Sequence, residues 1–128
     1  MRGLTLVIAG AVLLLAMGCG APTVKITIGT PSPDAVYAIK EGIHAIDIAV
    51  RSYAVDNNDV YPEPSLVNES GLADYVSGNS PWPTNPYTDQ PMSQGTGPGD
   101  YAYTLSADAF ELVGYGEGGK AVFTVPVP

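Results

Sequence analysis

The sequence predicts an α+β fold in which an N-terminal amphipathic helix packs on an antiparallel sheet of three to four strands. Two observations predict this fold. Between residues 35 and 53, apolar side chains recur every three or four positions, as on one stripe of an α-helix. Between residues 101 and 125, apolar and polar side chains alternate in three short runs separated by hairpin-length turns. A helix with one apolar stripe and a sheet with one apolar face can bury these surfaces against each other in a two-layer domain.

The predicted helix begins near Ser32 and ends near Asn57. Ser32 is a suitable N-cap and Pro33 suits the first helical turn. A run of Asp and Asn followed by Tyr61-Pro62 ends the helix. Its apolar stripe consists of Val36, Ile39, Ile43, Ile46, Val50 and Tyr53. Its polar side carries Lys40, Glu41, His44, Asp47 and Arg51. We therefore expect one side to face a single partner layer and the other to face water.

Between this helix and the strands, the sequence predicts one short helix over 71–76 and then a long irregular loop over 78–100. Four prolines between 81 and 91 and three glycines between 95 and 99 exclude regular structure there. Trp82, Tyr87 and Met92 are expected to pack this loop. The three strands are predicted at 101–105, 110–115 and 121–125, joined by turns that are each short enough for a hairpin.

Length and charge limit the domain count and the partners. The 128 residues suffice for one small domain beyond the N-terminal segment. Thirteen acidic and five basic residues give a net charge of −8, and removing residues 1–18, with Arg2, would give 4 − 13 = −9. Such a surface argues against a nucleic-acid partner, because it cannot neutralise phosphates in number. Cys19 is the sole cysteine, so no internal disulfide and no cysteine-rich metal site can form.

The N-terminus has the pattern of an export segment. Arg2 precedes about fourteen apolar or small residues, the length of a signal-peptide core. The sequence Leu-Ala-Met-Gly-Cys that ends at Cys19 resembles a bacterial lipobox, which implies cleavage before Cys19, acylation of its thiol and attachment to a membrane. Residues 1–18 would then be a signal peptide and residues 19–32 a tether. The globular domain is thus expected outside the cytoplasm, in the cell envelope.

The same segment permits a second interpretation. Residues 2–7, Arg-Gly-Leu-Thr-Leu-Val, resemble the prepilin leader of type IV pilins and pseudopilins, in which a peptidase cuts after the glycine, here Gly3. Ile8 stands where that family places an acidic residue, and prolines at 22, 31 and 33 interrupt what is one long helix in that family. Residues 1–18 could therefore be a degenerate prepilin leader, and both interpretations stay open.

The remaining sequence also resembles this family. The elements that carry the resemblance are, in order, the helix end from Tyr53 to Tyr61-Pro62, Gly71-Leu72 followed by Tyr75, Trp82-Pro83 with Asn85-Pro86-Tyr87, and Pro98-Gly99-Asp100-Tyr101 with Tyr103 before a final hairpin. Over about residues 35–119 they are similar to the globular domain of type II secretion pseudopilins and type IV pilins. The resemblance implies that residues 33–128 form a pilin-like domain.

The resemblance implies a non-enzymatic component of a type II secretion or type IV pilus system, with other pilins or envelope secretion proteins as partners. With His44 as the sole histidine, no catalytic triad assembles. The major pseudopilin looks like a calcium binder, which makes Asp100, Asp108 and Glu117 the candidate ligands here. The alternative is a surface lipoprotein binding module that holds a ligand or partner with the loop around Trp82 and Tyr87.

Overall fold

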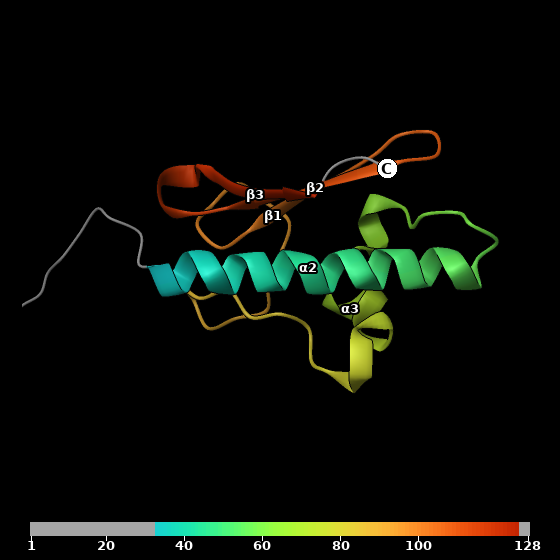
Figure 1. The fold of residues 1–128 in the computed structure, drawn as a ribbon, viewed down its shortest axis with the longest axis horizontal. Helices are drawn as coiled ribbons and strands as arrows, with labels where there is room; N and C mark the ends of the chain where they lie inside the picture. The colour runs from blue at the N-terminus through green and yellow to red at the C-terminus, as the bar shows by residue number, and fades with distance from the viewer. Residues whose placement is uncertain (1–32, 126–128) are drawn as a thin grey trace, which may run out of the picture. The chain divides into compact units, whose positions relative to one another are not determined.

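A computed structural model of the chain describes residues 33–125, and Figure 1 shows their arrangement. The N-terminal predictions, namely the leader over 1–18, the Gly3 cleavage site, Cys19 and the tether over 19–32, lie outside the described residues. The described elements are, in order, α2 (Pro33–Asp56), the 3₁₀ turn η3 (Pro64–Leu66), α3 (Glu69–Leu72), η4 (Ala73–Tyr75), η5 (Ser77–Asn79), β1 (Tyr101–Leu105), β2 (Phe110–Tyr115), η6 (Glu117–Gly119) and β3 (Ala121–Val125). The α+β class is therefore confirmed.

Helix α2 begins and ends close to the predicted positions. Pro33 opens it and Asp34 lies in its first turn, where a carboxylate complements the positive end of the helix dipole. At its end, the N–H groups of Asn57 and Asp59 both donate to the carbonyl of Ala54, at 3.0 and 2.8 Å. Asn58 and Asp59 adopt positive φ angles of 59° and 63°. These two residue types tolerate the left-handed region, so the helix ends in an ordered turn without glycine.

The three strands form an antiparallel meander in the order β1-β2-β3. Tyr103 pairs with Leu112, and Gly114 pairs with Phe123. A bulge between Gly114 and Tyr115 shifts the register at the end of β2. The strand bounds coincide with the predicted ones, because period-2 alternation and short turns specify a meander more tightly than most other patterns.

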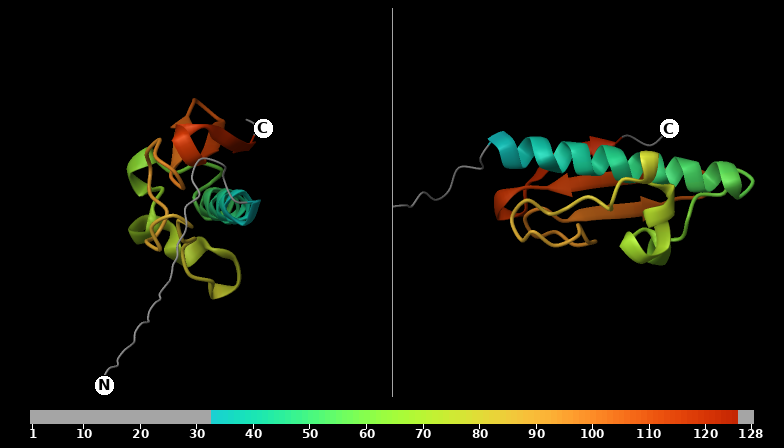
Figure 2. Two further views of the ribbon diagram at one scale, coloured as in Figure 1. Left: turned by 90° about the vertical axis from the view of Figure 1, so that its left-hand side faces the viewer. Right: turned by 90° about the horizontal axis from the view of Figure 1, so that it is seen from below.

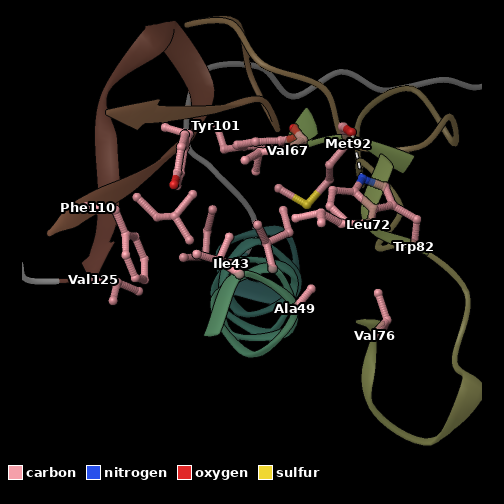
Figure 3. Packing of buried hydrophobic residues seen from close by; sticks show 14 of the residues in the cluster. Ile43, Ala49, Val67, Leu72, Val76, Trp82, Met92, Tyr101, Phe110 and Val125 are labelled. Atoms are coloured by element: carbon pink, nitrogen blue, oxygen red, sulfur yellow. Dashed lines mark hydrogen bonds between the residues drawn. The ribbon is translucent and has the colours of Figure 1, made fainter. Parts of the chain in front are cut away.

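At Gly114 the side chains of α2 lie directly against the backbone of the sheet. A Cβ atom built on Gly114 would lie 2.7 Å from Ile43 Cγ1 and 2.8 Å from Ile39 Cγ2. Both isoleucines are fully buried, as are Phe110 and Leu112 on the sheet. Figure 3 shows Ile43 and Phe110 in this core. The absence of a side chain on Gly114 is therefore what lets the two isoleucines reach β2.

A second layer covers α2, which corrects the expectation of a single partner layer. The segment between α2 and β1 packs against a further side of the helix (Figures 1 and 2). At Gly42, an added Cβ would lie 2.5 Å from Met92 Sδ and 3.2 Å from Pro83 Cβ. Val67, Leu72, Val76, Trp82 and Met92 complete the core from this segment. Small residues such as Gly42 and Ala49 do not register as an apolar stripe, so the pattern of large apolar residues missed this second contact.

The predicted short helix over 71–76 is divided into α3 and η4 and begins two residues earlier. Asn68 causes the earlier start, because its Oδ1 accepts the Gly71 N–H at 2.9 Å and so caps α3 at its N-terminus. Two buried tyrosines then tie this region to the sheet. Tyr101 Oη donates to the Val67 carbonyl at 2.6 Å, and Tyr103 Oη donates to the Pro62 carbonyl at 2.8 Å.

Candidate functional site

Trp82 lies inside the loop that precedes β1 and is 3% exposed. Its indole Nε1–H donates to the Met92 carbonyl at 2.9 Å, and its ring centroid is 6.5 Å from that of Tyr101 (Figure 3). A tryptophan in this position satisfies its polar edge and buries its apolar faces. Of the two roles expected for Trp82, the structure therefore assigns it loop packing, and its ring faces are not accessible to a ligand.

Asn85 organises the same loop, a role that the sequence interpretation missed. Its side chain is buried, its Nδ2 donates to the Pro98 carbonyl at 2.9 Å, and its Oδ1 accepts the Tyr87 N–H at 2.8 Å. Gly99, at a φ of 82°, passes so close to this amide that a Cβ there would overlap it. An Asn placed between prolines, with an Asx turn into Tyr87, is the local signal that could have indicated this role.

Tyr87 is the loop aromatic that remains accessible, at 38% exposed. It lies two residues beyond Asn85, and the Asx turn fixes its backbone. Thr88, Asp89 and Gln90 after it are also exposed. Tyr87, unlike Trp82, is therefore placed to touch a partner.

The three candidate calcium ligands do not form one site. Asp100 precedes β1, whereas Asp108 lies in the turn between β1 and β2, so the five residues of β1 separate them by about 17 Å at about 3.4 Å per residue. Glu117 follows β2 at the same end as Asp100, whose carbonyl accepts the Tyr115 N–H at 3.0 Å. Among residues 33–125, no three His, Cys, Asp or Glu side chains gather as a metal site. The structure therefore does not bring the three side chains together, and calcium binding stays a prediction.

A hollow of about 340 Å³ lies between the first half of α2 and β3. It is lined by Tyr37, Lys40, Glu41, His44 and Phe123. Tyr37 is 64% exposed, and Lys40 Nζ lies 5.7 Å from the centroid of the Phe123 ring, within cation–π range. His44 is exposed, as its position on the polar side of the helix indicated. The hollow itself was not predicted, because Phe123 and Tyr37 are 86 residues apart, 123 − 37.

In comparisons with protein-family models, curated proteins and solved structures, no family, protein or structure matches this chain. Within the part of the chain that the structure describes, no helix has both the length and the apolar character needed to cross a membrane.

The geometry of the described domain leaves two places that can contact another molecule. One is the rim of the loop at Tyr87, held by the hydrogen bonds of Asn85. The other is the hollow along α2, with an aromatic wall and both signs of charge. Each combines apolar surface with polar groups, the composition typical of a protein contact.

Proposed function

We propose that this chain is an envelope-anchored, pilin-like protein that serves as a structural or accessory component of a type II secretion or type IV pilus system. Its role in this proposal is assembly rather than chemistry. Helix α2 and the meander then correspond to a pilin-like head, and the N-terminal segment attaches this head to the membrane through the prepilin or the lipoprotein route.

One observation supports the proposal most directly, namely that the sequence elements carrying the resemblance contact one another. The Pro62 carbonyl at the helix-end motif accepts a hydrogen bond from Tyr103. Trp82 packs near Tyr101, and Asn85 holds the Pro98 carbonyl. Motifs separated by up to 41 residues thus belong to one hydrogen-bonded core. Their order along the chain and their convergence in space are what a pilin-like head requires.

The location of the protein in cells tests the proposal. Filaments are sheared from the surface of cells that produce the full chain, and the sheared fraction is probed after chemical cross-linking. We expect the chain in the filament fraction or cross-linked to a pilin or to an envelope secretion protein. A chain that stays entirely with the membrane and cross-links to neither would contradict the proposal.

A second candidate function is the surface lipoprotein binding module, which the exposure of Tyr87 favours. In this version Tyr87, on its fixed Asx turn, contacts the ligand or partner and Trp82 only holds the loop. Replacing Tyr87 by Ala should then abolish capture of the partner while the domain stays folded. Unchanged capture by the Tyr87→Ala protein would remove this candidate.

A further inference from the structure

No element formed by residues 33–125 covers one side of α2, as Figures 1 and 2 show. Along it run four residues that we call the outer stripe: Tyr37, His44, Ile48 and Val55. Tyr37 and Val55 are 64% and 75% exposed. They are 55 − 37 = 18 residues apart, about five turns of a 3.6-residue helix, so both point to the same side. An exposed Tyr and an exposed Val at the two ends of one helix face form a surface without an internal partner.

The hollow described above opens on this same side, because Tyr37 and His44 of the outer stripe are two of its lining residues. Its volume of about 340 Å³ exceeds that of one valine side chain. It lies at the Tyr37 end of the stripe, and the protruding Val55 lies at the other end. The stripe therefore carries a recess and a protrusion on one face.

The charge around the stripe permits two copies of the chain to meet there. Residues 33–125 contain three basic and thirteen acidic residues, so their net charge is 3 − 13 = −10, and most faces of two copies repel each other. Two of these three basic residues, Lys40 and Arg51, lie beside the stripe. Asp34, Glu41 and Asp47 offset them, with Arg51 paired with Asp47 at 2.8 Å, so this part of α2 has a net charge of 2 − 3 = −1. The other charged residues of 33–125 sum to 1 − 10 = −9, so the stripe lies on the least repulsive part of a strongly acidic domain.

From this spacing, recess and charge we infer that the outer stripe binds a second copy of this chain. The two α2 helices lie antiparallel, and Val55 of each copy enters the hollow of the other. The twofold axis then passes close to Ile48, halfway between Val55 and the middle of the hollow. Such a contact is self-complementary and closed, as in most homodimers.

The size of the contact sets its strength. With the twofold axis at Ile48, residues 40–56 of the two helices face each other over about 26 Å, which at a width of about 10 Å gives about 260 Å² per copy. So small a contact fits a weak and transient dimer rather than a permanent one. The inference is independent of the proposed function, because it concerns the described domain and holds for either route of anchoring.

Cysteine cross-linking of the full chain in cell envelopes tests the inference. In an Ile48→Cys variant, the two cysteines face each other across the twofold axis, so mild oxidation should give a reducible dimer. The control is Val60→Cys, since Val60 is 61% exposed but lies in the turn beyond α2, off the stripe. The unsubstituted chain reports any dimer formed through Cys19. Equal dimer yields from Ile48→Cys and Val60→Cys would overturn the inference.

A second comparison tests the orientation and the role of Val55. A Glu41→Cys copy mixed with a Val55→Cys copy should cross-link in an antiparallel dimer, whereas Val55→Cys alone should not.

Val55→Asp should weaken the Ile48→Cys dimer more than about tenfold. Each valine that is buried in the contact strengthens dimer association by about a factor of ten or more. The matched change Val60→Asp should leave it unchanged. Val55 is exposed, so folding is retained. A Val55→Asp protein that dimerises as before, or a dominant Val55–Val55 cross-link, would contradict the inference.

Discussion

At the scale of single residues, Trp82 joins the loop to the core by a hydrogen bond to Met92 and by its ring contact with Tyr101. We expect Trp82→Ala to lower the free energy of unfolding by about 3–5 kcal/mol, as for other buried aromatic residues. Tyr87→Ala, in the same loop but 38% exposed, should lower it by less than about 1 kcal/mol. Urea denaturation followed by circular dichroism measures both, and equal losses would show that Trp82 does not hold the loop.

The hydroxyl of Tyr103 makes the free energy of unfolding depend on pH in the alkaline range. Burial, together with the nearby Glu63 and Tyr61, raises the pKa of Tyr103 to about 12, and burial has the largest effect. The unfolded chain has a tyrosine pKa of about 10. Because the folded state favours the protonated phenol, the stabilisation is fully present below pH ~10 and is lost as the pH rises through about 12. Burial, with the charge of Asp100, likewise raises the pKa of Tyr101, so both phenols act in the same direction.

Replacing Tyr103 by Phe tests this pH dependence. The variant should lose about 1 kcal/mol at neutral pH, since the Pro62 carbonyl loses its donor, and its stability should fall less steeply between pH 10 and 12. Tyr37→Phe, at a 64% exposed position, is the control and should reproduce the unsubstituted profile. Urea midpoints across this pH range give the answer, and identical slopes for Tyr103→Phe and the unsubstituted chain would contradict the assignment.

At the scale of elements, the approach of α2 to β2 depends on Gly114. In Gly114→Ala the new methyl group would meet Ile39 and Ile43, so we expect a loss of about 1–3 kcal/mol from overpacking. The control is Gly78→Ala, where nothing lies within 4 Å of the added Cβ and a φ of 68° costs only about 1 kcal/mol. Thermal unfolding of both variants separates the cost of overpacking at Gly114 from the cost of backbone strain at Gly78. A Gly114→Ala protein as stable as the unsubstituted chain would mean that the helix and sheet are not in close contact.

The elements that the sequence predicted well are those with a clear period. The bounds of α2 and of the three strands followed from spacing, caps and turns. The start of α3 at Glu69 was missed because it depends on the single cap at Asn68. The second layer over α2 was missed because Gly42 carries no side chain, so the contact of Met92 and Pro83 with it leaves no apolar pattern.

The candidate site was less predictable for a physical reason. Its parts are brought together by hydrogen bonds and by contacts between distant segments, as with Asn85 and Pro98, or Tyr37 and Phe123. Periodicity carries no information on such contacts. The three candidate calcium ligands are not gathered for a different reason, because an antiparallel hairpin places Asp108 at the far end from Asp100.

At the scale of the whole molecule, the domain is strongly acidic and offers two contact surfaces, at Tyr87 and along the outer stripe. An acidic domain stays soluble and repels its own copies over most of its surface. Contact with other proteins is then confined to a few faces, which suits a subunit or accessory of an assembly. How the N-terminus is processed decides whether the proposed pilin-like component can be a filament subunit.

The mass of the mature protein, isolated from cell envelopes, tests the central claim most directly. Processing as a prepilin after Gly3 predicts an intact mass that lacks only residues 1–3. This is the result expected for a subunit that assembles with pilins. A mature chain that begins at an acylated Cys19 would contradict assembly as a filament subunit and would leave an acylated accessory component or the lipoprotein binding module.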